Sequence, residues 1–208
     1  QFAVDDAEVV DAGACQLEAW YGEVESWIIP ACQFISNLEL GVGLGFLDDE
    51  EDVIAEMALE GKLQLRAPDL NTVGTGLVVG FGADPRRVAD PERIPALYSY
   101  VPVTLPLLEE NLTLHANIGW EYDVDAGEHL AFLGARADVA VYGPLLLYGE
   151  LFTLGVENPE YQFGLRIAAL PELLEFDITY GGHTESGLDG FGLTVGVAWT
   201  PPPFFTTL

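Results

Sequence analysis

Apolar and polar residues alternate with a period of two along most of this chain. Residues 37–46 read Asn-Leu-Glu-Leu-Gly-Val-Gly-Leu-Gly-Phe, so every even position is apolar and every odd position is polar or glycine. Such alternation predicts a β-strand with one apolar face and one polar face. Similar patterns predict further strands near 16–22, 26–32, 53–66, 73–82, 97–105, 112–122, 130–142, 145–153, 161–169, 174–180 and 191–199.

The connections between these strands differ in length. Short turns are predicted at Pro106–Asn111, Gly143-Pro144 and Pro171-Glu172, and longer polar loops at 84–94, 123–129, 155–160 and 181–187. Tight turns at one end and longer loops at the other are typical of outer-membrane barrels, in which strands come in even numbers. We therefore predict an all-β protein, a closed antiparallel up-and-down β-barrel of the outer-membrane type with about 12 strands (range about 10–12). The barrel would cover residues 14–199, between an N-terminal extension at 1–13 and a Pro-rich C-terminal extension at 200–208.

The alternation alone does not say which face of the sheet points outward. The polar face is rich in glycine, which suits a crowded or strongly curved interior. The apolar face carries aromatic residues near the strand ends, as in the interfacial girdles of membrane barrels. These residues are Trp120, Tyr122, Tyr161, Tyr180, Phe191 and Trp199. We predict that the apolar face meets lipid; a soluble barrel or sandwich with an apolar interior is the alternative.

The polar face also carries charges of both signs, which predicts a network inside the lumen. Cations are few and lie among many carboxylates, a pattern that indicates paired charges rather than a solvated surface. The predicted members of this lumen network are Glu39, Glu56, Glu60, Lys62, Arg66, His115, Glu121, Arg136, Asp138, Glu150, Arg166, Glu175 and Asp177. For His115 we expect a hydrogen-bonded lumen residue rather than a ligand.

The composition narrows the classes of function. The chain is 50% hydrophobic but has no run of about 18 apolar residues, so no transmembrane helix is expected. The net charge is −27, with 7 Lys and Arg against 34 Asp and Glu. This balance argues against a nucleic-acid partner, which requires basic patches. Acidic loops such as Asp48–Asp52 offer oxygen ligands to divalent cations, although the EF-hand glycine and spacing are missing. Self-repulsion of solvated loops is the alternative reading of this run.

Cys15 and Cys32 are the two cysteines of the chain. A disulfide is expected in an oxidising compartment, whereas metal binding is disfavoured because no histidine lies nearby. The chain begins at Gln1 without a starting Met, as a secreted protein does after signal removal. These observations favour the bacterial outer membrane, with an extracellular location as the alternative.

Two motifs invite a catalytic interpretation. Gly41–Gly45 resembles a phosphate-binding loop, but the strand period explains its glycines and no helix pattern follows. His183 and Ser186, with Glu185 between them, are the residue types of a hydrolase, but no nucleophile elbow surrounds the serine. We predict no catalytic residues, no metal site and no cofactor.

Several short motifs resemble those of a known family. They are Cys15–Trp20, Pro30–Cys32, Asn37–Leu40, Leu114–Trp120, Gly149–Phe152, Gly164–Arg166 and Thr179–Gly181. Together they resemble proteobacterial outer-membrane barrel proteins related to the family labelled as transporters of the MetA pathway of phenol degradation. This resemblance implies a barrel in the outer membrane; it implies neither a substrate nor catalytic residues. The chain departs from the pattern at its ends, where extensions precede the first strand and follow Trp199.

The best interpretation is a narrow, cation-leaning channel, transporter-like protein or structural protein of the outer membrane. Its partners would be membrane lipid or identical subunits. One alternative is a secreted barrel that assembles into an extracellular fibre through its terminal extensions, by adding strands to neighbouring copies. The other is an outer-membrane lipid hydrolase that uses His183 and Ser186.

Overall fold

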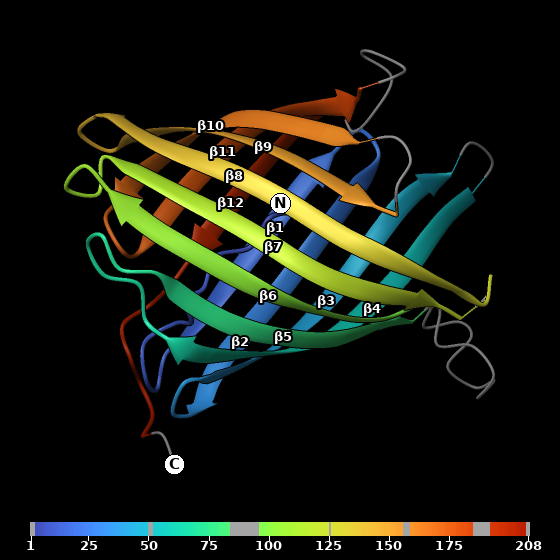
Figure 1. Ribbon diagram of the computed structural model, residues 1–208, viewed down its shortest axis with the longest axis horizontal. Coiled ribbons are helices and arrows are strands. Elements are labelled where there is room, and N and C mark those ends of the chain that lie inside the picture. The colour runs from blue at the N-terminus through green and yellow to red at the C-terminus, as the bar shows by residue number, and fades with distance from the viewer. Residues whose placement is uncertain are drawn as a thin grey trace.

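The computed structural model describes residues 3–49, 52–83, 96–124, 126–155, 159–184 and 192–206. In these residues, twelve antiparallel strands form one closed barrel (Figure 1). Each strand pairs with its neighbours in the chain, and β1 pairs with β12 to close the sheet. The strands are β1 (Cys15–Gly22), β2 (Glu25–Ile35), β3 (Leu38–Asp49), β4 (Asp52–Arg66), β5 (Gly74–Ala83), β6 (Ala96–Leu107), β7 (Leu112–Asp123), β8 (Glu128–Tyr142), β9 (Leu145–Leu154), β10 (Glu160–Leu170), β11 (Leu174–His183) and β12 (Gly192–Trp199). The predicted closed up-and-down barrel is confirmed.

The apolar face of the sheet lies outside. On β3, the side chains of Leu40, Val42 and Leu44 are 45%, 41% and 45% exposed, whereas Glu39 on the opposite face is 7% exposed. Successive side chains of a strand point to opposite faces, so one alternating sequence supplies both the outer surface and the lumen. Similarly exposed apolar residues of other strands include Leu77, Val79, Ile118, Leu133, Leu147, Leu151, Phe163, Phe176, Ile178, Leu193 and Val195. The alternative with an apolar interior is therefore wrong for this chain.

Aromatic residues gather near both ends of the strands. Trp120, Tyr122 and His129 form one cluster of stacked rings where β7 and β8 meet, and the His129 ring lies 5.6 Å from Trp120 and 4.7 Å from Tyr122. The ring of Phe163 stacks on Tyr161 at 6.3 Å and meets Tyr180 at a tilt at 5.8 Å. Tyr142 and Trp199, 84% and 47% exposed, are the last residues of β8 and β12, at the other end of the barrel from these rings. Phe191 lies outside the described residues.

One end of the barrel, named here the turn end, carries the start of β1, the end of β12 and the connections β2–β3, β4–β5, β6–β7, β8–β9 and β10–β11. In the β2–β3 turn, Asn37 has a φ of 63°, a left-handed conformation that asparagine tolerates better than most residues. The β6–β7 turn contains three successive left-handed residues, Leu108, Glu109 and Glu110, with φ of 51°, 58° and 68°. The opposite, loop end carries the two longest connections, β5–β6 and β11–β12, together with the short β1–β2 connection. No helix among the described residues is long and apolar enough to cross a membrane.

The predicted disulfide between Cys15 and Cys32 is confirmed. The two residues stand opposite each other in the β1–β2 ladder, with a Cα–Cα distance of 4.0 Å. Both extensions are held by the turn end of the barrel. The Phe204 N–H donates to the Gly13 carbonyl (3.0 Å), and the ring of Phe205 stacks on Phe34 of β2 at 5.1 Å.

Candidate functional site: an occupied polar lumen

Residues 3–13, named here the inner segment, enter the barrel at the turn end and run inside it (Figure 1). The side chains of Val4 and Ala7 are 0% exposed. The inner segment forms no strand, and within the described residues Gly13 is its one member whose backbone N–H donates to a backbone carbonyl of a strand, that of Gln33. Buried backbone groups nearly always need hydrogen-bond partners, and here most of them come from side chains of the wall.

Glu150 of β9 and Arg136 of β8 bind the deepest described part of the inner segment. The N–H groups of Ala3 and Val4 donate to the two carboxylate oxygens of Glu150, at 3.1 and 3.0 Å. Nη1 of Arg136 donates to the Val4 carbonyl at 2.7 Å. Hydrogen bonds to charged groups are the stronger ones in proteins. Glu150 and Arg136 thus bind the backbone of Ala3 and Val4 rather than its side chains.

Uncharged side chains of three other strands continue this pattern. With its amide oriented to meet complementary partners, Asn117 of β7 donates to the Asp5 carbonyl (2.9 Å) and accepts from the Asp5 N–H (2.8 Å). The Ala7 N–H donates to Oγ1 of Thr104 on β6 (2.8 Å), and Nε2 of Gln64 on β4 donates to the Ala7 carbonyl (3.2 Å). The wall therefore binds the main chain of the inner segment at several points along its path.

Lys62 of β4 supplies the counter-charge for the acidic side chains of the inner segment. Its Nζ lies 3.0 Å from Oδ1 of Asp5 and 3.1 Å from Oδ1 of Asp6, and its side chain is 9% exposed. The hydroxyl of Tyr100 donates to the other oxygen of Asp5 at 3.2 Å. Burial raises the pKa of Asp6, but the charges of Lys62 and Arg136 outweigh burial and hold that pKa below its usual range. Asp6 is therefore bound as a carboxylate.

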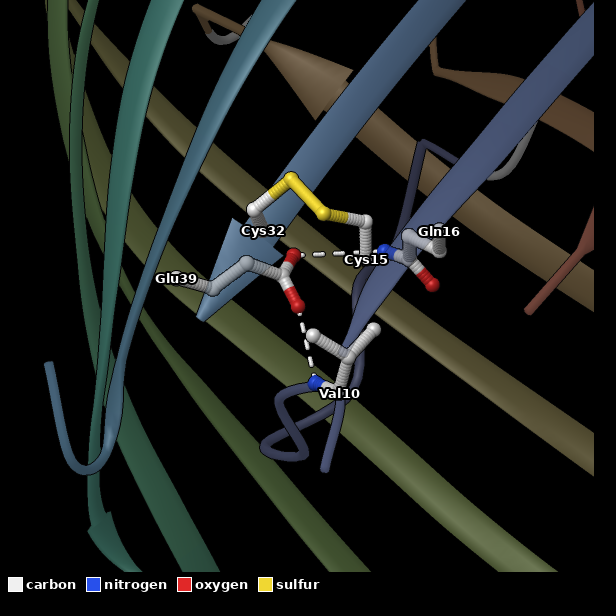
Figure 2. Close-up of a disulfide and its surroundings, with 5 residues drawn as sticks. All are labelled: Val10, Cys15, Gln16, Cys32 and Glu39. Carbon is white, nitrogen blue, oxygen red and sulfur yellow. Dashed lines mark hydrogen bonds between the residues drawn. A yellow bond between two sulfur atoms is a disulfide. The ribbon is translucent and has the colours of Figure 1, made fainter. Parts of the chain in front are cut away.

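Glu39 of β3 holds the inner segment where it nears the wall (Figure 2). One carboxylate oxygen accepts from the Val10 N–H at 2.8 Å, and the other accepts from Nε2 of Gln16 at 3.2 Å. The Cys15–Cys32 disulfide joins β1 to β2 beside this contact, as Figure 2 shows. The wall and the inner segment are thus tied together at the start of β1.

Other predicted charges of the wall pair with one another, within one strand or between neighbouring strands. Arg166 of β10 lies between Asp177 and Glu175 of β11, with Nε–Oδ1 and Nη1–Oε2 distances of 2.7 and 2.9 Å. His115 contacts Oγ1 of Thr104 through Nδ1 (3.0 Å) and Oδ2 of Asp138 through Nε2 (3.2 Å). Nε of Arg136 also lies 3.1 Å from Oδ1 of Asp138. These contacts form two clusters of charged and polar side chains on the inner wall, one on β6, β7 and β8 and the other on β10 and β11.

Other predicted members have different places. Glu60 accepts a hydrogen bond from the Tyr98 hydroxyl at 2.9 Å, and Glu56 and Glu121 are half-buried nearer the loop end. Arg66 is exposed at the end of β4, so the prediction that it belongs to the lumen network is wrong. The ladder between β4 and β5 shifts register between Gln64 and Arg66, which breaks the strict alternation that assigned Arg66 to the polar face. The expectation of simple Glu–Arg pairs was also incomplete, since Glu39, Lys62 and Glu150 bind the inner segment.

A cavity of about 680 Å³ lies beside the inner segment. Acidic residues outnumber basic ones in its lining: the acids include Glu18, Glu39 and Glu60, and the described cations that reach it are Lys62 and Arg166. Its aromatic lining residues are Trp20, Tyr98 and Tyr100. The Tyr98 ring lies directly on Gly80 of the neighbouring strand, where any Cβ would collide with it. Glycine on the polar face therefore makes room for lumen rings.

The residues named for the catalytic and metal-binding alternatives lie partly outside the described residues. Nδ1 of His183 lies 3.5 Å from Oε1 of Glu160, while Ser186 lies outside the described residues. The arginines at 86, 87 and 93 and the side chains of the acidic run 48–52 also lie outside the described part. Among the side chains that the structure describes, no group of three or more His, Cys, Asp or Glu residues could hold a metal ion.

The inner segment is the functional element that sequence reasoning missed. The sequence predicts an N-terminal extension before the first strand, but no pattern within that extension predicts a path through the lumen. A usable signal was present, because two adjacent acids, Asp5 and Asp6, precede a barrel whose polar face has few cations. That signal does not say which cation binds them.

Comparison with known proteins places the chain in a family. Residues 1–199 match the family described as "Uncharacterised conserved protein UCP029691". No curated protein sequence matches the chain. Among solved structures, the KdgM porin in complex with disordered oligogalacturonate is similar, with a TM-score of 0.66, 7% identity, and coverage of 89% of this chain and 98% of that one. The NanC porin has a TM-score of 0.59, 12% identity, and coverage of 89% and 99%. The chain therefore belongs to the family of uncharacterised conserved protein UCP029691, and its fold is the twelve-stranded barrel of these porins.

Proposed function

We propose that this protein is a bacterial outer-membrane barrel that acts as a narrow, porin-like channel with a preference for cations. The observation that carries the proposal is the exposed apolar surface around a lumen in whose lining acidic residues outnumber cations. An outer surface of this kind is stable in lipid and costly in water. A lumen with an excess of carboxylates attracts cations and repels anions.

The bound ligand of one structural neighbour does not suit this lumen. Oligogalacturonate, the ligand of that KdgM complex, is a chain of sugar carboxylates. Here the cavity walls contribute Glu18, Glu39 and Glu60 against Lys62 and Arg166. We therefore propose small cations rather than acidic oligosaccharides as the permeant class. The phenol-degradation resemblance stays a prediction and adds no substrate.

The two other functions considered from sequence receive no comparable support. A fibre subunit needs its extensions for contacts with neighbouring copies, whereas here both extensions bind their own barrel through Lys62, Glu150 and Phe34. A hydrolase would need Ser186, which lies outside the described residues. We propose no enzymatic step.

The experiment that tests the proposal is ion selectivity in planar lipid bilayers under a KCl gradient. We expect channels whose reversal potential has the sign of K⁺ preference. The double substitution Glu18→Gln/Glu60→Gln removes two lumen charges and should lower that preference. The control Glu109→Gln/Glu110→Gln removes two exposed charges in the β6–β7 turn and should leave it unchanged. Absence of channels, or preference for Cl⁻, would refute the proposal.

A further inference from the structure

We propose that the inner segment, residues 3–13, is a removable plug, so that the channel opens fully when this segment leaves the lumen. This inference rests on the proposed channel function. It assigns to a stretch outside the barrel strands the role of closing the path through it.

The inner segment occupies the lumen of the barrel. Val4 and Ala7 are fully buried, and the inner segment receives hydrogen bonds or ion pairs from β3, β4, β6, β7, β8 and β9. Those partners stand on about half of the strands around the wall, so the inner segment crosses the lumen rather than following one strand. About ten residues reach at most about 33–36 Å when extended, which is comparable to the thickness of a bilayer's hydrocarbon core.

The contacts between the inner segment and the wall are reversible. Within the described residues, the inner segment adds no strand to the sheet, and its partners from residue 3 to residue 10 are polar side chains. Water can replace such partners once the inner segment moves, so withdrawal leaves the barrel ladder intact. The carboxylates of Asp5 and Asp6 lie in a lumen in which acidic residues outnumber cations, and they depend on Lys62 for their ion pairs. Lys62 therefore holds the plug in the lumen through these two ion pairs.

Gly13 is a fixed pivot for the inner segment. Gly13 has a φ of +80°, in the region that favours glycine, and its N–H donates to the Gln33 carbonyl at 3.3 Å. The Ala14 carbonyl accepts from the Gln33 N–H at 3.0 Å, and the disulfide then locks the first residue of β1 to β2. The chain therefore leaves the wall at Gly13, and the part before it can move without disturbing β1.

The test compares single-channel currents of four full barrels in the same bilayers: the intact chain and three variants. The variants are a deletion of residues 3–10, the double substitution Asp5→Asn/Asp6→Asn, and the matched control Glu8→Gln/Asp11→Asn. The control makes the same change of charge within the inner segment, but at two exposed residues. Circular dichroism and thermal unfolding in detergent establish that each variant is a folded barrel.

We expect the deletion to give a several-fold larger conductance than the intact chain. Asp5→Asn/Asp6→Asn keeps the length of the chain and should reach the same large level intermittently, with its open probability about 10- to 100-fold higher, because two charge-assisted contacts with Lys62 are lost. The control should match the intact chain.

Equal conductance of the deletion variant and the intact chain would overturn the plug while leaving the channel function in place. Equal effects of the two double substitutions would also overturn it, because the general loss of charge, and not the loss of the Lys62 ion pairs, would then control opening. If no variant conducts, the channel function fails and the plug fails with it. Should the deletion variant not fold, the comparison of the two double substitutions decides the question alone.

Discussion

The substitution Lys62→Met removes the cation that Asp5 and Asp6 share inside the barrel. In the intact protein, its Nζ lies 3.0 and 3.1 Å from their carboxylates, and the side chain of Lys62 is 9% exposed. Met has nearly the same length and fills the same space without charge. The two carboxylates would then be left among the acidic residues of the lumen.

The size of the effect follows from those contacts. A hydrogen bond to a charged group is worth about 1.5–3 kcal/mol, so two of them give an upper range of about 3–6 kcal/mol. The side chains of Asp5 and Asp6 are 28% and 34% exposed, which screens part of that energy. We therefore expect docking of the inner segment to weaken by about 3 kcal/mol, a factor of about 100 in its equilibrium constant.

Amide hydrogen exchange of the peptide that covers residues 3–13 measures this constant directly. In the intact protein the N–H groups of Val4 and Ala7 are bonded to Glu150 and Thr104, so they should exchange slowly. In Lys62→Met they should exchange about 100-fold faster, because each undocking event exposes them. The matched control is Arg66→Met, which removes an exposed cation at the end of the same strand. Unchanged exchange in Lys62→Met, or equal acceleration in both variants, would refute the role given to Lys62.

Two further predictions concern acid pH and the lumen glycines. The pKa of Asp6 is lowered by docking, so this residue stabilises the docked state above its ordinary pKa of 3.8 and loses that contribution as pH falls below it. After correction for intrinsic exchange, protection of the inner segment should therefore decline as the pH falls below about 4; protection that stays constant from about pH 5 to about pH 2 would contradict the assignment. Gly80→Val should destabilise the barrel by about 1–3 kcal/mol in urea unfolding, because its side chain would meet the Tyr98 ring, whereas Gly82→Val on the same strand has open space around its Cβ and should be close to neutral. Equal losses in the two glycine variants would show that ring packing is not the cause.

The strands and their faces could be read from the sequence because both depend on a local rule. A period of two assigns Leu40 and Glu39 to opposite sides wherever the chain runs extended, and every predicted strand range overlaps a strand of the barrel. The same rule explains the one misplaced charge. Arg66 follows a register shift against β5, and a single irregular residue is enough to reverse the face that a strict alternation assigns.

The sequence by itself determined that this chain forms alternating strands, that apolar residues and lumen charges fall on opposite faces, and that Cys15 and Cys32 pair. These properties follow from residues near one another in the chain or directly across one hairpin. Only the tertiary structure decided what fills the lumen. The inner segment has no periodicity of its own, and Val4 meets Glu150 across 146 positions of sequence. Such partners become neighbours only when β1 closes on β12, because closure brings side chains of distant strands around one axis.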